Sequence, residues 1–127
     1  MSIAIGVGVP LEKIYCRKRR KLKGRKRNRK KEKERRKNTP IYSGVVKDFP
    51  VALAEVARCS MAGQIQHNPD VPLGWDRAKS GDELDALMRH LSDHSIEPVD
   101  DDGQLHLAKV AWRALAALQK HLEGEKV

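Results

Sequence analysis

The chain has 127 residues, a length typical of one domain, and a formal net charge of +9. The charge is uneven, because residues 17–37 hold 16 Lys or Arg against two Glu, whereas residues 38–127 hold 9 Lys or Arg against 14 Asp or Glu. The part expected to fold is therefore acidic. The two cysteines, Cys16 and Cys59, lack the spacing of a zinc site, so we expect free thiols in a reducing compartment.

The first 41 residues are expected to form a flexible N-terminal segment. Residues 1–16 lack the basic region and cleavage site of a secretory signal, and no apolar run is long enough to span a membrane. We therefore expect a cytoplasmic protein without membrane contact. Residues 17–37 contain one aliphatic side chain, Leu22, which predicts a disordered basic arm because little apolar surface can be buried. Such an arm favours non-specific nucleic-acid binding through phosphates, and the alternative is a segment that only aids solubility.

The remaining residues, 42–127, are expected to form a helical domain. Pro50 suits the first turn of a helix that continues to about His67. Glu55 is the acidic residue of this segment, and it is either exposed or part of a carboxylate cluster. Residues 67–79 are predicted to be a loop, because Pro and Gly interrupt any helix there. Trp75 in this loop could cover the small core or face a base.

A short helix is predicted for residues 80–94. Ser80 and Glu83 have the spacing of a capping box, and apolar residues recur every three or four positions. The apolar face comprises Leu84, Leu87, Met88 and Leu91, and the opposite face comprises Asp82, Asp85, Arg89 and Asp93. This charged face is either solvated and held by i,i+4 ion pairs, or a site for a divalent metal and phosphate, because hard cations prefer clustered carboxylate oxygens.

The last helix is predicted for residues 104–123, after an acidic run at residues 100–102 that we expect to cap it. Its apolar face comprises Leu107, Ala111, Ala114, Leu115, Leu118 and Leu122, and a separate basic stripe comprises His106, Lys109, Arg113 and Lys120. The two charged faces either pack as complementary solvated surfaces, or carboxylates hold Mg²⁺ while cations hold phosphate. In the second case the phosphate contacts would be Arg89, His90, His106 and Lys109.

Several motifs occur in a specific order across residues 42–122. They are YSGVVKDFP, QHNP, WDR, KSGDE, DAL and RHL, then DDDG followed by LHLAKVAWRALA. This order resembles a family of small phage proteins, the dATP/dGTP diphosphohydrolase N-terminal domains. The chain contains no GxGxxG, GxxxxGKS or GxSxG, so dinucleotide-binding, P-loop and serine-hydrolase chemistry are not suggested.

The resemblance implies an all-α fold similar to the all-α nucleoside triphosphate pyrophosphohydrolases. It also implies hydrolysis of a purine dNTP to dNMP and pyrophosphate, in phage nucleotide metabolism within the host cytoplasm. The implied Mg²⁺ ligands and catalytic carboxylates are Glu55, Asp82 and Asp85. The first acidic pair departs from the family pattern, because Arg58 and Cys59 stand where a second acid would follow Glu55.

The same resemblance assigns the substrate contacts. His67 and Trp75 would face the purine, and Arg89, His106 and Lys109 would offset the charge that develops on pyrophosphate. We therefore expect an all-α bundle of about three main helices, preceded by the disordered basic arm and assembled as a homo-oligomer, because the chain is small and its apolar faces are broad. The alternative functions are a non-catalytic nucleic-acid-binding phage accessory protein that uses the arm, or a family member with a purely structural role.

Overall fold

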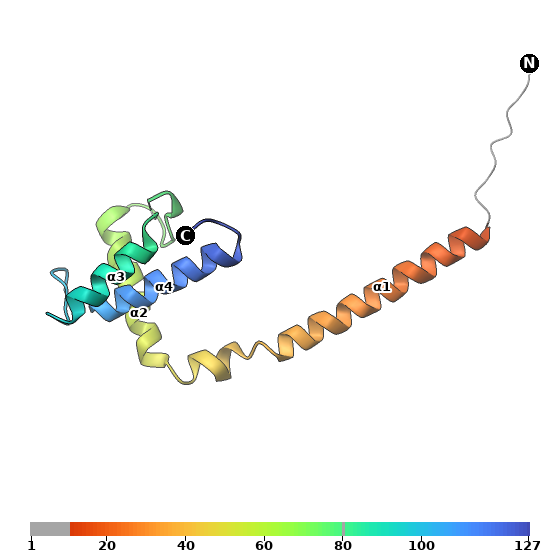
Figure 1. Ribbon diagram of the computed structural model, residues 1–127, viewed down its shortest axis with the longest axis horizontal. Coiled ribbons are helices and arrows are strands. Elements are labelled where there is room, and N and C mark those ends of the chain that lie inside the picture. Colours follow the sequence, from red (N-terminus) through yellow and green to blue (C-terminus); the bar gives the residue numbers. More distant parts are fainter. Residues whose placement is uncertain (1–10, 80) are drawn as a thin grey trace, which may run out of the picture. The chain divides into compact units, whose positions relative to one another are not determined.

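The structure is a computed structural model that describes residues 11–79 and 81–127, with side chains described from residue 22 onward apart from residue 80. Its regular elements are helices, which confirms the predicted all-α class (Figure 1). Within the described residues no strand occurs, and one isolated antiparallel bridge joins Val99 to Leu105. No helix in this part of the chain is long and apolar enough to cross a membrane. Contacts divide the chain between Val45 and Val46 into two compact units.

The first unit contains a long basic helix, α1, over Leu11–Lys37. The disorder predicted for residues 17–37 is therefore wrong. Lys and Arg have high helix propensity, and Glu32 forms ion pairs with Arg35 and Arg36 at 2.8 and 3.5 Å. The prediction considered only burial and left out these local preferences. Its described side chains are exposed apart from the partly buried Glu32.

The second unit begins after a single π-helical turn, Tyr42–Val46, and contains the three main helices that the sequence predicts. α2 covers Pro50–His67 with Pro50 in its first turn, as predicted. α3 covers Glu83–His94 and α4 covers His106–Leu122. The Ser80 half of the predicted capping box lies outside the described residues. A short 3-10 turn, Arg77–Lys79, lies in the loop between α2 and α3.

The acidic run before α4 does not cap that helix. Leu105 occupies the N-cap position, and no side-chain hydrogen bond caps the first turn. The run instead forms a tight turn, in which the Gly103 amide donates to the Asp100 carbonyl at 2.8 Å and Gly103 has φ +78°. A positive φ favours glycine, because a Cβ atom would be strained there. The turn brings two of the acidic side chains, Asp100 and Asp102, to Lys109 on the side of α4.

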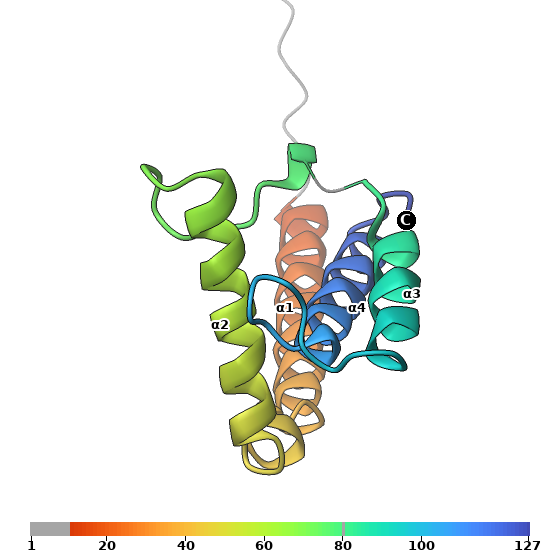
Figure 2. The ribbon, with the colours of Figure 1, turned by 90° about the vertical axis from the view of Figure 1, so that its left-hand side faces the viewer.

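α4 lies between α2 and α3 and packs against both (Figure 2). The contact of Glu83 with Lys120 and that of His90 with His106 show that α3 and α4 run antiparallel. Small side chains line this packing: the buried apolar residues of the described chain are Ala86, Ala108, Ala116 and Ala117. Glu83 and Lys120 are buried among them and form an ion pair at 3.0 Å. The helices therefore approach closely through alanines and one ion pair.

Most of the leucine-rich faces of α3 and α4 is exposed, although Leu87 is partly buried. Their exposed side chains are Leu84, Met88, Leu91, Leu107, Leu115, Leu118 and Leu122, and we call this set the leucine surface. Exposure runs from 43% at Leu91 to 72% at Leu122. At about 100° per residue, these stripes lie on the same side of the antiparallel α3–α4 pair. The second unit thus presents a two-helix apolar face without formal charge.

Candidate functional site

A cavity of about 400 Å³ lies within the second unit, bounded by α2, α4 and the loop of residues 68–79. This volume is within the range of about 300–1,000 Å³ that small-molecule sites occupy. The lining residues from α2 are Cys59, Ser60, Gly63, Gln64, Gln66 and His67. The lining residues from the following loop are Asn68, Gly74, Trp75, Asp76 and Lys79. The lining residues beyond it are His90, Asp102, Lys109, Trp112 and Arg113.

Gln64 shapes the loop that closes one side of the cavity. Its Nε2 donates to the carbonyl oxygens of Asn68 and Val71 at 2.5 and 2.8 Å, and its Oε1 accepts from the Gly74 amide at 3.3 Å. Lys79 Nζ donates to the Asn68 side chain at 3.0 Å. These bonds satisfy backbone groups that have no regular secondary structure. The loop is therefore held in one conformation beside α2.

Two tryptophans form an aromatic wall. Trp75 from the loop meets Trp112 of α4 edge to face, with ring centroids 5.7 Å apart and planes at 83°, an arrangement that aromatic pairs favour. The guanidinium of Arg77 lies 4.4 Å from the Trp75 ring centroid, and that of Arg113 lies 5.5 Å from the Trp112 centroid. Trp75 therefore packs against α4 and also lines the cavity, whereas its contact with a base stays a prediction.

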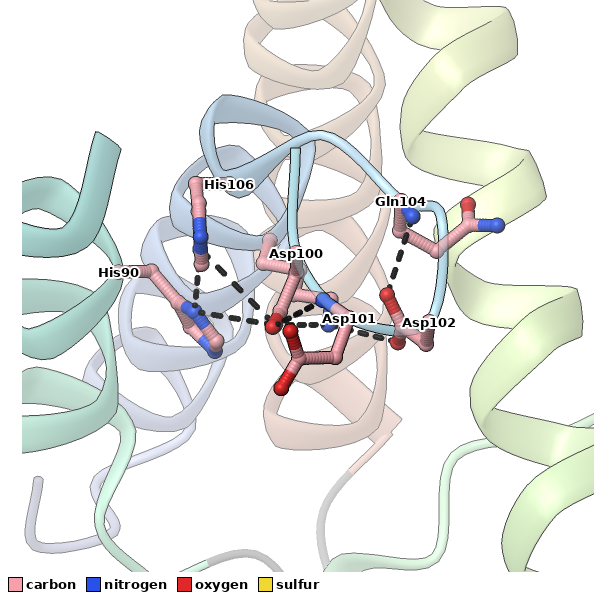
Figure 3. Close-up of polar contacts among 7 residues, drawn as sticks. His90, Asp100, Asp101, Asp102, Gln104 and His106 are labelled. Carbon is pink, nitrogen blue, oxygen red and sulfur yellow. Dashed lines mark hydrogen bonds and ion pairs between the residues drawn. The ribbon is translucent and has the colours of Figure 1, made fainter. Parts of the chain in front are cut away.

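A charged cluster joins the acidic turn to α3 and α4 (Figure 3). Lys109 Nζ donates to Asp100 Oδ2 at 2.5 Å and to Asp102 Oδ2 at 2.6 Å. The Nδ1 atoms of His90 and His106 lie 3.1 Å apart, and each lies 3.9 Å from Asp100 Oδ2. His106 is buried, whereas His90 is half-buried and lines the cavity. Residues distant in sequence thus meet at one end of α4.

The environment of this cluster perturbs several titrating groups. Burial lowers the pKa of His90, and the nearby Lys109 ammonium lowers it further. Burial alone would lower the pKa of Lys109, but hydrogen bonds to Asp100 and Asp102 outweigh it, so that pKa is raised. The hydrogen bond from Lys109 in turn holds the pKa of Asp100 below its ordinary value. Burial raises the pKa of the Cys59 thiol, which disfavours a reactive thiolate in the cavity.

The structure gathers most of the predicted substrate contacts. His67, Trp75, His90 and Lys109 all line the cavity, and His106 contacts His90 behind it. Arg89 does not join them, because its guanidinium pairs with the Asp82 carboxylate at 2.7 Å on the exposed side of α3.

The predicted carboxylates are placed differently. Glu55 pairs with Arg58 on α2, and Asp82 pairs with Arg89. Neither residue lines the cavity, nor does Asp85. Among the described residues, Glu55, Asp82 and Asp85 do not form a group with ligand atoms within 4.8 Å of one another. The structure therefore does not assemble the three carboxylates as a metal site, because two of them are already ion-paired on separate helices.

Sequence reasoning missed Arg113, Lys79 and Gln64 as cavity residues. The sequence did place Arg113 in one basic stripe with Lys109, one helical turn before it, but only Lys109 was named as a substrate contact. Lys79 and Gln64 gave no such signal, because their role depends on how the loop folds back on α2.

The fold and its cavity define a small all-α domain with a cavity lined by tryptophans and cations. The model of one protein family, dATP/dGTP diphosphohydrolase, N-terminal, matches residues 25–127, and the chain belongs to this family. The match begins within the basic segment, whereas we expected it to begin at Tyr42, so the C-terminal part of α1 is included. No curated protein and no solved structure matches the chain.

Proposed function

We propose that the domain binds a purine dNTP in the cavity and hydrolyses it to dNMP and pyrophosphate. The proposal depends on one observation: the Trp75–Trp112 wall, Lys79 and Arg113 all line the same cavity of about 400 Å³. An aromatic wall suits a purine, and cations suit a triphosphate. The family match supports the same substrate class. We place this activity in phage nucleotide metabolism, in the host cytoplasm where dNTPs are found.

Arg113 is the best phosphate contact within the cavity. The charge of Lys109 is offset by Asp100 and Asp102, whereas the guanidinium of Arg113 faces the Trp112 ring and can present two parallel donors to a phosphate. His67, at the C-terminal end of α2, and Trp75 lie where the base would enter. Base and phosphate contacts therefore come from different walls of one cavity.

Mg²⁺ remains part of the expectation from sequence, but its predicted ligands do not fit. Glu55 and Asp82 are engaged by arginines, and neither they nor Asp85 line the cavity. We therefore derive no step of the reaction from a Mg²⁺ ion held by these three carboxylates. Their separation does not affect the binding argument, which depends on the cavity alone.

The test is to incubate the full chain with each dNTP and a divalent cation and to separate the products. We expect dNMP and pyrophosphate from dGTP or dATP, and weaker dGTP binding by Arg113→Gln, by about tenfold or more, because a charge-assisted hydrogen bond contributes about 1.5–3 kcal/mol. Arg89→Gln is the matched control, since Arg89 lies outside the cavity. No turnover of any dNTP, or equal losses in both variants, would contradict the proposal.

We also propose that the domain self-associates through the leucine surface. The buried apolar residues of the described chain are alanines, so the hydrophobic core of the second unit is small. The leucine surface carries no formal charge and therefore suits an apolar partner. A second copy meets this requirement, because a two-helix face can pair with itself about a two-fold axis to form a four-helix bundle.

Nucleic-acid binding through residues 17–37 is the second candidate function. It is favoured by the helical form of this segment, because the Lys and Arg side chains of α1 are exposed from residue 22 onward. Contacts with phosphates release counterions, so we expect affinity for duplex DNA to fall steeply as salt rises, with little sequence preference. A chain that begins at Asn38 should lose this binding, while its remaining circular dichroism still shows α2, α3 and α4 with a cooperative thermal transition. If the shortened chain bound duplex DNA as tightly as the full chain, residues 17–37 would not be the binding site.

A further inference from the structure

His90 and His106 bring two imidazole nitrogens together at the edge of the cavity. Their Nδ1 atoms are 3.1 Å apart, and the rings lie 5.3 Å apart between centroids at 38°. Two nitrogens bound to one ion, each at about 2.0–2.1 Å, are about 2.8–3.0 Å apart at a right angle and about 3.3–3.4 Å apart at a tetrahedral angle. The observed separation of 3.1 Å lies between these two values and is therefore compatible with two ligands on a shared metal ion.

A carboxylate completes the group. Asp93 follows His90 by three residues on α3, and its oxygen lies within 4.8 Å of a ligand nitrogen of each histidine. His90, Asp93 and His106 each offer one ligand atom, and these three atoms all lie within 4.8 Å of one another. Asp100 is also close to both rings, but Lys109 already binds its oxygen. We propose that His90, His106 and Asp93 bind a divalent transition-metal ion. This site differs from the Glu55, Asp82 and Asp85 set, and it does not depend on the proposed nucleotide reaction.

The donor set decides the kind of ion. Imidazole nitrogens suit Zn²⁺ and other late first-row ions such as Co²⁺ and Ni²⁺, whereas Mg²⁺ strongly prefers oxygen ligands and retains its water. Three protein ligands leave at least one position open for water or a phosphate oxygen. His90 also lines the cavity, so an ion held there would lie at the edge of the space that Lys109 and Arg113 share.

The surroundings fix the two rings in place. His106 is the first residue of α4 and is buried, which limits its rotamers. Asp100 lies 3.9 Å from both Nδ1 atoms, but Lys109 holds it at 2.5 Å, so it provides negative charge beside the ion without being needed as a ligand. Outer carboxylates of this kind are common around metal-bound histidines.

A hydrogen bond between two neutral rings is the competing explanation of the short contact. It requires one Nδ1 to donate and the other to accept, whereas metal binding requires both Nδ1 atoms to be bare and both Nε2 atoms to carry hydrogen. The two states differ only in tautomer and carry the same charge. Direct metal titration therefore distinguishes them.

The experiment is titration of the full chain with Co²⁺, followed by its visible absorption and by calorimetry, with excess Mg²⁺ present. We expect one Co²⁺ per chain, displacement by Zn²⁺, and at least tenfold weaker binding in His90→Gln and in Asp93→Asn. His121→Gln is the matched control, because it removes an exposed histidine near the other end of α4. Circular dichroism checks that each variant is folded.

The proposal is overturned if Co²⁺ shows no saturable binding, if Mg²⁺ displaces it, or if His90→Gln binds as tightly as His121→Gln. Unchanged binding in Asp93→Asn alone would remove that residue from the ligand set. Because the readout is metal binding and not turnover, absence of dNTP hydrolysis with intact Co²⁺ binding would contradict the nucleotide proposal and leave this one standing.

Discussion

Self-association through the leucine surface can be tested by placing a carboxylate at its centre with Leu118→Glu. Leu118 lies on α4 and is 54% exposed in the isolated chain. Full burial of a Leu or Met side chain contributes about 1.5–3 kcal/mol, so covering the exposed half contributes about 1 kcal/mol. The members of the leucine surface in two copies together supply about 14 kcal/mol, against an association cost of about 4–15 kcal/mol. The surplus is therefore at most about 10 kcal/mol, so we expect a dimer whose dissociation constant is no lower than about 10⁻⁸–10⁻⁷ M.

Leu118→Glu should weaken this dimer by about a thousandfold or more. Two copies lose about 2 kcal/mol of burial, and each introduced carboxylate adds at least about 1–3 kcal/mol of uncompensated desolvation, while each 1.4 kcal/mol changes the dissociation constant tenfold. Sedimentation velocity over a range of concentrations measures the effect. Ile65→Glu is the matched control, because Ile65 is an exposed aliphatic residue of α2 outside the leucine surface. A wild-type chain that remains monomeric at millimolar concentration, or equal effects of both variants, would refute the reasoning.

Three further predictions concern the stability and titration of the second unit. Lys120→Met leaves Glu83 buried without its ammonium partner and should lower the free energy of unfolding by about 3–5 kcal/mol in urea denaturation, whereas Lys120→Met with Glu83→Leu should recover most of the loss. Arg77→Ala should return the pKa of Glu123 upward toward its ordinary value in an NMR titration, because a hydrogen bond from Arg77 is the main cause of its lowering. The Arg77–Glu123 pair stabilises the fold at pH values above the ordinary pKa of Glu, and this stability is lost as pH falls through the lowered pKa of Glu123. In Arg77→Ala, the free energy of unfolding should therefore change less with pH on the acid side. Gly103→Ala should cost about 1–2 kcal/mol in thermal unfolding, because φ is +78° although the Cβ would meet open space.

Local interactions account for what could be predicted in this chain. Pro50 and the spacing of Leu84, Met88 and Leu91 depend on backbone geometry within a few residues, so the sequence alone located α2, α3 and α4 and the all-α class. The helix over the basic segment was missed for a related reason. The prediction weighed the absence of burial at residues 17–37, whereas the high helix propensity of Lys and Arg is itself local and was left out.

Which helix face becomes buried was decided only by the tertiary structure. Periodicity identifies an apolar stripe, but it does not say whether that stripe meets its own chain or another surface. α3 and α4 pack through alanines and through the Glu83–Lys120 ion pair. This close packing competes with burial of the leucines between the same two helices. The leucine surface therefore remains exposed. The predicted amphipathic pattern was therefore present, but most of its leucine stripe lies beside the packed face and stays exposed.

The candidate site also combines features that the sequence predicts with features that only the packing decides. The sequence by itself determined that titratable and basic side chains would gather on the facing helices, and it named His67, Trp75, His90 and Lys109 before the cavity was visible. It could not determine that the Nδ1 atoms of His90 and His106, sixteen positions apart, would lie 3.1 Å from each other. It also could not determine that Asp82 would form an ion pair with Arg89. Such pairings depend on helix rotation and on the turn at Gly103, and these are set by the packing of the whole unit, because side-chain direction changes by about 100° for each residue along a helix.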